Sequence, residues 1–204
     1  MLNSHRAARV LTTMTMIGAM VGVLTACTKA EPPPAAAASP VKLTAGIQDI
    51  MKDMIDPAAD FLWESVSTTE TASGVEEKQP RTDEEWNEVR KQALILAESA
   101  NLIVMEGRHV AREGQKLDDH GTPGNLTAEE SQKVIAAERA AFVGFGQALH
   151  DVGVQFLEVA EQRSPQAMMD AGETMDQICE GCHLKFWYPG QVIPPLPDQA
   201  PSAN

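Results

Sequence analysis

The 204-residue sequence is poor in aromatic residues, in cysteine and in positive charge. Aromatic residues make up 4% of the chain, and the alternating β-branched runs that predict strands are missing, which favours an all-α fold class. With 16 lysines and arginines against 29 aspartates and glutamates, the formal net charge is −13. This acidity argues against nucleic acid or an anionic membrane surface as a partner. It suits transient docking to basic proteins, and the alternative is that it only keeps the protein soluble. The sequence offers no Ser/His/Asp arrangement, paired-carboxylate site or phosphate-binding glycine loop, so it does not indicate substrate turnover.

The N-terminal apolar run is too short to span a membrane. Val10–Leu24 is 15 residues long, whereas a spanning helix needs about 20, and its basic start predicts a signal peptide over residues 1–26. The string Leu24-Thr25-Ala26-Cys27 resembles the lipobox of bacterial lipoproteins, in which the chain is cut before the cysteine and the sulfur is diacylated. An ordinary secretory signal is the alternative. The resemblance, with Thr28 after the cysteine, implies lipid anchoring at Cys27 on the periplasmic side of the outer membrane of a Gram-negative bacterium.

Composition divides the rest of the chain into a linker, one domain and a tail. Residues 27–43 are rich in proline and alanine, which favours an extended and semi-rigid spacer. Residues 44–190 are numerous enough for one domain with its own core. Further prolines in residues 191–204 predict an extended tail.

Apolar residues recur at helical spacing in four segments of the domain, which predicts four amphipathic helices. Thr82 and Thr127 each begin a capping box, and Ser164 is followed by proline at the first helical position. A further helix is expected to start near Thr44. The three capped helices are expected to end before Gly107, at Arg163 and before Pro189.

Four amphipathic helices can bury their apolar stripes together in an antiparallel up-down four-helix bundle, which is the simplest arrangement. Pro57 interrupts the first helix, either by kinking it or because Asp56-Pro57 caps a fresh helix. The connections over residues 67–81 and 108–126 are long for a bundle and contain glycine, so we expect both to be irregular loops.

The most specific motif is Cys179-Glu180-Gly181-Cys182-His183. Cys-x-x-Cys-His is typical of the attachment site of a c-type haem. Each thiol can add to a vinyl group of the porphyrin to form a thioether bond, and His183 can then supply one axial ligand to the iron. The cysteine pair alone would also suit a redox dithiol or half a zinc site. With Cys27 assigned to the lipobox, no second cysteine pair remains for zinc, so haem attachment is favoured and a dithiol is the alternative.

A haem motif on the last helix of a four-helix bundle resembles the class II c-type cytochromes, which include cytochrome c′ and cytochrome c556. The resemblance rests on Cys179, Cys182, His183 and Phe186, and on the helix order over residues 44–188. It implies one covalently bound haem c, with iron, held by thioethers from Cys179 and Cys182 and ligated by His183. Family members are often dimers, which leaves a homodimer open.

The resemblance places the sixth iron ligand on the first helix. Met51 is the predicted distal ligand, with Met54 as the alternative. A His/Met iron implies a monohaem carrier of single electrons between redox proteins, and not an enzyme. A five-coordinate iron that binds NO or CO, as in cytochrome c′, is the alternative. Trp187 stands where cytochrome c′ typically has a basic residue, which argues against its gas chemistry on that side of the haem.

Haem carries two propionates, and basic side chains are the candidates to pair with them. These candidates are Arg90, Lys91 and Arg108, for which surface ion pairs are the alternative. Trp187 is the best candidate to pack on the porphyrin, because it lies four residues after His183.

Overall fold

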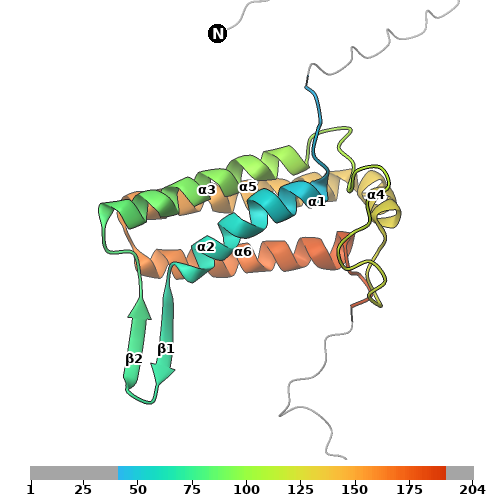
Figure 1. The fold of residues 1–204 in the computed structure, drawn as a ribbon. Helices are drawn as coiled ribbons and strands as arrows, with labels where there is room; N and C mark the ends of the chain where they lie inside the picture. Colours follow the sequence, from blue (N-terminus) through green and yellow to red (C-terminus); the bar gives the residue numbers. More distant parts are fainter. Residues whose placement is uncertain (1–40, 192–204) are drawn as a thin grey trace, which may run out of the picture. The chain divides into compact units, whose positions relative to one another are not determined.

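The computed structural model describes residues 41–191, which are mostly helical (Figure 1). The elements in chain order are α1 Ile47–Ile50, the π-helical turn η1 Met51–Ile55, α2 Asp56–Glu64, β1 Ser67–Thr71, β2 Gly74–Lys78, α3 Asp83–Ile103, α4 Ala128–Ala137, α5 Arg139–Gln162 and α6 Pro165–Phe186. The predicted signal peptide, lipidated Cys27, most of the linker and residues 192–204 of the tail lie outside the described residues. Within residues 41–191, none of the helices has the length and hydropathy needed to cross a bilayer.

The first helical segment contains a π-helical turn just before Pro57. α1 begins after Gly46, whose N–H donates to Asp49 Oδ2 at 2.8 Å, so the helix starts later than the predicted Thr44. Proline has no N–H to donate to the carbonyl of Asp53, and its ring crowds that carbonyl. The chain widens into η1 and then continues as α2, with Pro57 in its first turn. The expected interruption is therefore present, as a π-turn inside one run of helix.

Capping boxes begin two of the helices, as predicted. Glu85 N–H donates to Thr82 Oγ1 at 3.2 Å and Thr82 N–H donates to Glu85 Oε2 at 2.8 Å, and Thr127 and Glu130 repeat the arrangement at α4. The prediction of one helix from 127 to 163 is wrong, because the chain breaks at Glu138 (φ −118°, ψ 41°) between α4 and α5. Tertiary contacts favour this break: Glu138 pairs with Lys185 on α6 at 2.6 Å.

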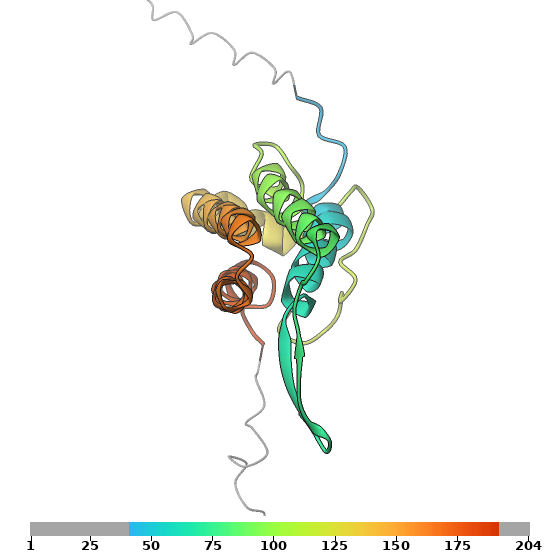
Figure 2. The same cartoon turned by 90° about the vertical axis from the view of Figure 1, so that its left-hand side faces the viewer.

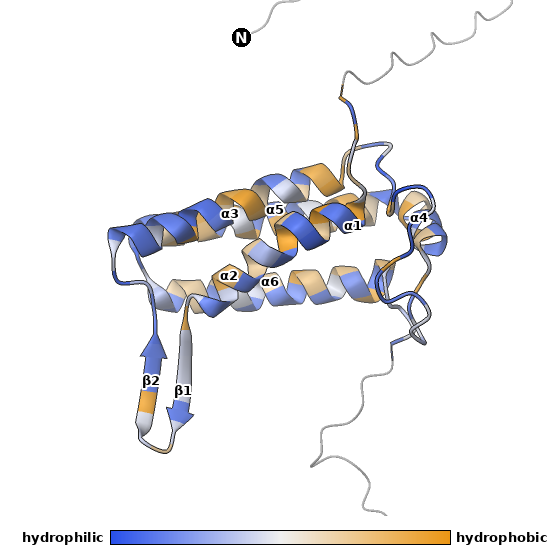
Figure 3. Ribbon diagram, viewed as in Figure 1, coloured by the Kyte–Doolittle hydropathy of each residue, from blue (hydrophilic) through white to orange (hydrophobic). Residues whose placement is uncertain are grey.

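A β-hairpin corrects both the all-α prediction and the expectation of an irregular loop over residues 67–81. β1 and β2 pair antiparallel, with Ser67 opposite Lys78 and Thr71 opposite Gly74. The hairpin extends away from the helices in Figures 1 and 2, and its strands are almost entirely exposed. Figure 3 shows it as largely hydrophilic, apart from the exposed Val75. The second long connection, over residues 108–126, is irregular as predicted.

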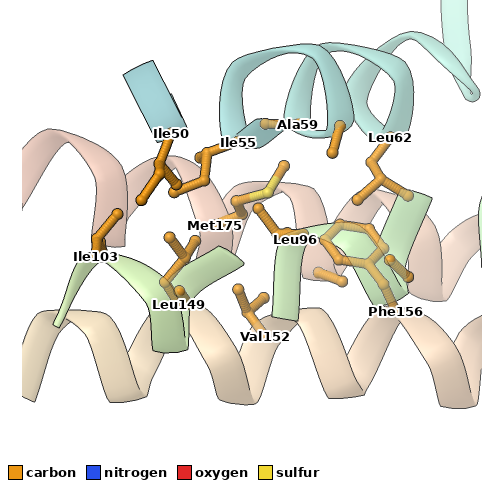
Figure 4. Packing of buried hydrophobic residues seen from close by; sticks show 14 of the residues in the cluster. Ile50, Ile55, Ala59, Leu62, Leu96, Ile103, Leu149, Val152, Phe156 and Met175 are labelled. Atoms are coloured by element: carbon orange, nitrogen blue, oxygen red, sulfur yellow. The ribbon is translucent and has the colours of Figure 1, made fainter. Parts of the chain in front are cut away.

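The long helices contact one another in a ring around a common core. α3 packs against α5 and α2, and α6 packs against α5 and α2, which is visible along the helix axes in Figure 2. Figure 4 shows apolar side chains from these helices converging between them. The core includes Leu62 from α2, Leu96 from α3, Phe156 from α5 and Met175 from α6, all at most 1% exposed.

Small residues let α3 and α5 approach each other closely. A methyl group added at Gly153 on α5 would lie 2.8 Å from the backbone nitrogen of Ala97 on α3. A methyl group at Gly146 would lie closer still to Val104, just after α3. The helices α3 and α5 form the most extensive helix–helix contact within residues 41–191.

Candidate functional site

Both cysteines of the Cys-x-x-Cys-His motif lie near the C-terminal end of α6 on one side of the helix. Cys179 and Cys182 are three residues apart, and residues at this spacing face the same way on a helix. Both are free thiols and are partly buried against the core. Gly181 between them lets α5 come near, because a methyl group there would lie 3.2 Å from the ring of Phe145.

Two adjoining hollows lie between this part of α6, α5 and the first helical segment. We call them the Trp187 hollow and the Trp63 hollow, because each of these tryptophans lines one hollow and not the other. The Trp187 hollow contains about 720 Å³ of empty space and the Trp63 hollow about 860 Å³, both counted with space open to solvent. Most of the lining side chains are apolar, and the residues that line both hollows are Met51, Asp56, Phe142, Cys182 and His183.

His183 is held between aromatic rings at the end of α6. Its imidazole lies edge-on to Trp187, with ring centroids 4.9 Å apart, and 5.6 Å from the ring centroid of Tyr188. Tyr188 is fixed in turn by donating its hydroxyl to Glu180 Oε2 at 2.7 Å. Burial lowers the pKa of His183, which favours the neutral imidazole that can donate a lone pair to a metal.

The thiols have little tendency to ionise. Burial raises the pKa of Cys179 to about 11, with further increases from the nearby Asp176 and Asp56. Burial and the neighbouring Cys179 raise the pKa of Cys182 to about 12. Redox-active dithiols are typically marked by depressed thiol pKa values. The environment of the pair therefore disfavours the dithiol alternative.

The structure distinguishes the two methionines that are candidates for the distal ligand. Met51 begins η1 and lines both hollows, together with His183 of α6. Met54 lies in the same π-turn and packs against the core, but it is not among the lining residues of either hollow. π-Turns inside α-helices occur frequently at functional sites, and here the turn contains Met51. The arrangement agrees with the preference for Met51, whose ligation stays a prediction.

Carboxylates gather at the Trp63 hollow. Asp56, Asp60, Asp176 and Glu180 all line it. Burial, and then the charge of Asp60, raise the pKa of Asp56. Negative charge near a redox centre stabilises its more oxidised, more positive form.

The basic residues singled out from the sequence have other partners. Arg108 is buried, and its guanidinium donates to the carbonyls of Leu102 and Ala45, both at 2.6 Å. Lys91 pairs with Glu88 at 2.8 Å on the surface of α3, where Arg90 is also exposed. The basic side chain that does line a hollow is Lys52, which pairs with Asp118 at 2.5 Å beside the Trp187 hollow.

Sequence reasoning missed Ser131 of α4, which is 3% exposed and lines the Trp187 hollow. Its position four residues before Ile135, within the apolar stripe of that helix, was the signal that could have found it.

Among residues 41–191, no three His, Cys, Asp or Glu side chains gather closely enough to hold a metal ion by themselves. Comparison of the chain with protein families, with curated proteins and with solved structures found no match in any of the three.

Proposed function

We propose that this protein is a class II-like c-type cytochrome that carries single electrons between redox proteins. The observation that supports it best is that Met51 from η1 and Cys182 and His183 from α6 line the same two hollows. A thioether, a thiol and an imidazole are the groups that tether and ligate a haem. The proposal includes the finer fold assignment, an up-down four-helix bundle of α1–η1–α2, α3, α5 and α6.

The residues present fit a haem. The hollows have the mixed character that a porphyrin requires, with a mostly apolar lining and a smaller number of polar groups in each hollow. Two of those polar groups, Ser131 Oγ and Trp187 Nε1, are buried without a hydrogen-bond partner among the described residues. Such atoms are rare in native structures and indicate that a group with hydrogen-bond acceptors belongs beside them.

A bound haem would supply an iron centre that changes by one electron. In this chain Cys179 and Cys182 would tether it, and His183 and Met51 would hold the iron from two walls of the hollow. Trp187 and Tyr188 fix the orientation of the imidazole. The mostly apolar lining would pack against the ring, and the carboxylates around the Trp63 hollow would oppose the rise in potential that a methionine ligand gives.

The proposal also includes the cellular setting. A lipid on Cys27 would anchor the protein to the periplasmic side of the outer membrane, and the linker would separate the domain from the bilayer. The strongly acidic chain would favour basic redox partners, because opposite charge speeds encounter.

The test is an absorption spectrum of protein matured with a c-type haem assembly system, oxidised and reduced, with and without CO. We expect a covalent haem mass and low-spin iron that is indifferent to CO. Met51→Ala should convert the iron to a high-spin form that takes up CO, while the matched control Met54→Ala should keep the wild-type spectrum.

Each other result has a definite meaning. High-spin iron in the wild type that binds CO would support the five-coordinate gas-binding alternative and exclude methionine ligation. The converse pattern for the two variants would assign the ligand to Met54. A matured protein without covalent haem would refute the proposal as a whole.

A further inference from the structure

Two polar side chains without hydrogen-bond partners line the same part of the candidate haem site. Ser131 of α4 and Trp187 at the end of α6 both line the Trp187 hollow, and neither lines the Trp63 hollow. Ser131 Oγ and Trp187 Nε1 each have less than 1 Å² of accessible surface and no hydrogen-bond partner within residues 41–191. Both carry a proton that they can donate. A buried donor without an acceptor is unfavourable, so an acceptor is expected in the hollow that both residues line.

The charges around the two hollows indicate which acceptor fits. Asp60, Asp176 and Glu180 line only the Trp63 hollow, which is therefore a poor place for a further carboxylate. The Trp187 hollow has fewer carboxylates at its lining: Asp56, which it shares with the Trp63 hollow, and Asp118, which pairs with Lys52. Of the two hollows, the Trp187 hollow therefore repels an anionic acceptor less.

We propose that Ser131 Oγ and Trp187 Nε1 donate hydrogen bonds to the haem propionates, which lie in the Trp187 hollow. This inference rests on the proposed haem site and adds its orientation. The propionates occupy the edge of a haem opposite its two vinyl groups, and the vinyl edge is set by the cysteines. Cys182 lines both hollows and Cys179 lines only the Trp63 hollow, so the cysteines lie on the Trp63 side and the opposite edge is assigned to the side of Ser131 and Trp187.

The first test uses the wild-type haem protein and needs no variant. In the reduced, diamagnetic state, with CO added if the sixth position is open, NMR should detect the Trp187 indole N–H close to propionate methylene protons. Its exchange with solvent should be slower than in the haem-free chain. The indole of Trp63, which donates to the Gly172 carbonyl at 3.1 Å, provides an internal reference whose bond does not depend on haem.

The second test compares matched variants by resonance Raman spectroscopy. Trp187→Phe and Ser131→Ala should shift the low-frequency propionate bending modes and lower the reduction potential, because the carboxylate charge loses a donor. As one control, Trp63→Phe removes an indole from the other hollow. As a second control, Ser99→Ala removes a buried hydroxyl of α3 that has no hydrogen-bond partner within residues 41–191, and Ser99 lines neither hollow. Both controls should leave the propionate modes unchanged.

The outcomes separate this inference from the function on which it rests. A protein without covalent haem refutes the proposed function. Covalent haem with no contact between Trp187 and the propionates, and with propionate modes indifferent to both variants, refutes the orientation alone. If Trp63→Phe shifts these modes and Trp187→Phe does not, the haem is bound with its propionates in the Trp63 hollow.

Discussion

The close contact between α3 and α5 can be tested by one pair of glycine substitutions on the same helix. Gly153 and Gly144 both lie inside α5. A methyl group at Gly153 would lie 2.8 Å from the nitrogen and 2.9 Å from the Cα and Cβ of Ala97, whereas at Gly144 nothing lies within 4 Å. Gly153→Ala therefore adds a methyl group inside the contact, and Gly144→Ala adds the same group at an exposed position.

The expected magnitudes follow from two opposing effects. Alanine is favoured over glycine in a helix interior by about 1 kcal/mol, and both variants gain this amount. Overpacking in a closely packed contact costs about 1–3 kcal/mol, which only Gly153→Ala pays because Ala97 presents backbone atoms that cannot rotate away. We expect Gly144→Ala to be about 1 kcal/mol more stable than wild type and about 2 kcal/mol more stable than Gly153→Ala.

The assay is urea unfolding of the haem protein followed by far-UV circular dichroism, with the slope of the transition checked for equality across the three proteins. A difference of about 2 kcal/mol corresponds to a separation of roughly 4–8 °C in melting temperature for a domain of this size. Equal stability of the two variants would contradict the close approach of α3 and α5. The absorption spectrum of Gly144→Ala should match wild type, because this residue lines neither hollow.

Two further predictions concern the periphery of the domain. Replacing residues 68–77 by Asn-Gly should change the free energy of unfolding by less than about 1 kcal/mol, because the hairpin packs on no helix and its flanking residues Ser67 and Lys78 are already paired. A loss of helical circular dichroism in that variant would show that the hairpin supports the core. Glu130→Gln should destabilise the protein at pH 7, because the Thr127 N–H and hydroxyl lower the pKa of Glu130 and so favour its charged form. A lowered pKa gives stability that is present above the unfolded-state value, about 4.3, and is lost as the pH falls through the folded-state value. The difference from wild type in urea unfolding should therefore shrink below pH 4, and a constant difference would contradict the charged capping box.

The sequence predicted well those features whose signals are local. The caps at Thr82, Thr127 and Ser164 were predicted because a side-chain acceptor three residues before a free N–H is a contact within one turn. The β-hairpin was missed because its strands are exposed and rich in threonine and glutamate, so they lack the apolar alternation that marks a half-buried strand. The break at Glu138 has neither proline nor glycine and depends on packing against other elements.

In the candidate site, too, the features set by local sequence were predicted and those set by contacts between distant segments were not. The spacing of Cys179, Cys182 and His183 placed them together near the end of one helix without any knowledge of the fold. Met51 and Met54 lie one turn apart, and only the π-turn and the position of α6 determine which one lines the hollows. Arg108 is attractive as a propionate partner from its charge alone, but it is buried, donates to two backbone carbonyls and lines neither hollow.

The two sides of the domain differ in how closely their helices pack. On one side, α3 and α5 pack so closely that glycine and alanine are required at the contact, and this pair provides a rigid support. On the other side, α2 and α6 touch over a smaller area, and the hollows that contain Met51 and His183 lie there. A haem bound between them would supply apolar contacts that these helices do not make with each other, and a flat ring held against a rigid support would move little when its charge changes. Small movement on a change of charge is what a carrier of single electrons requires, so this packing is compatible with the electron transfer that we propose.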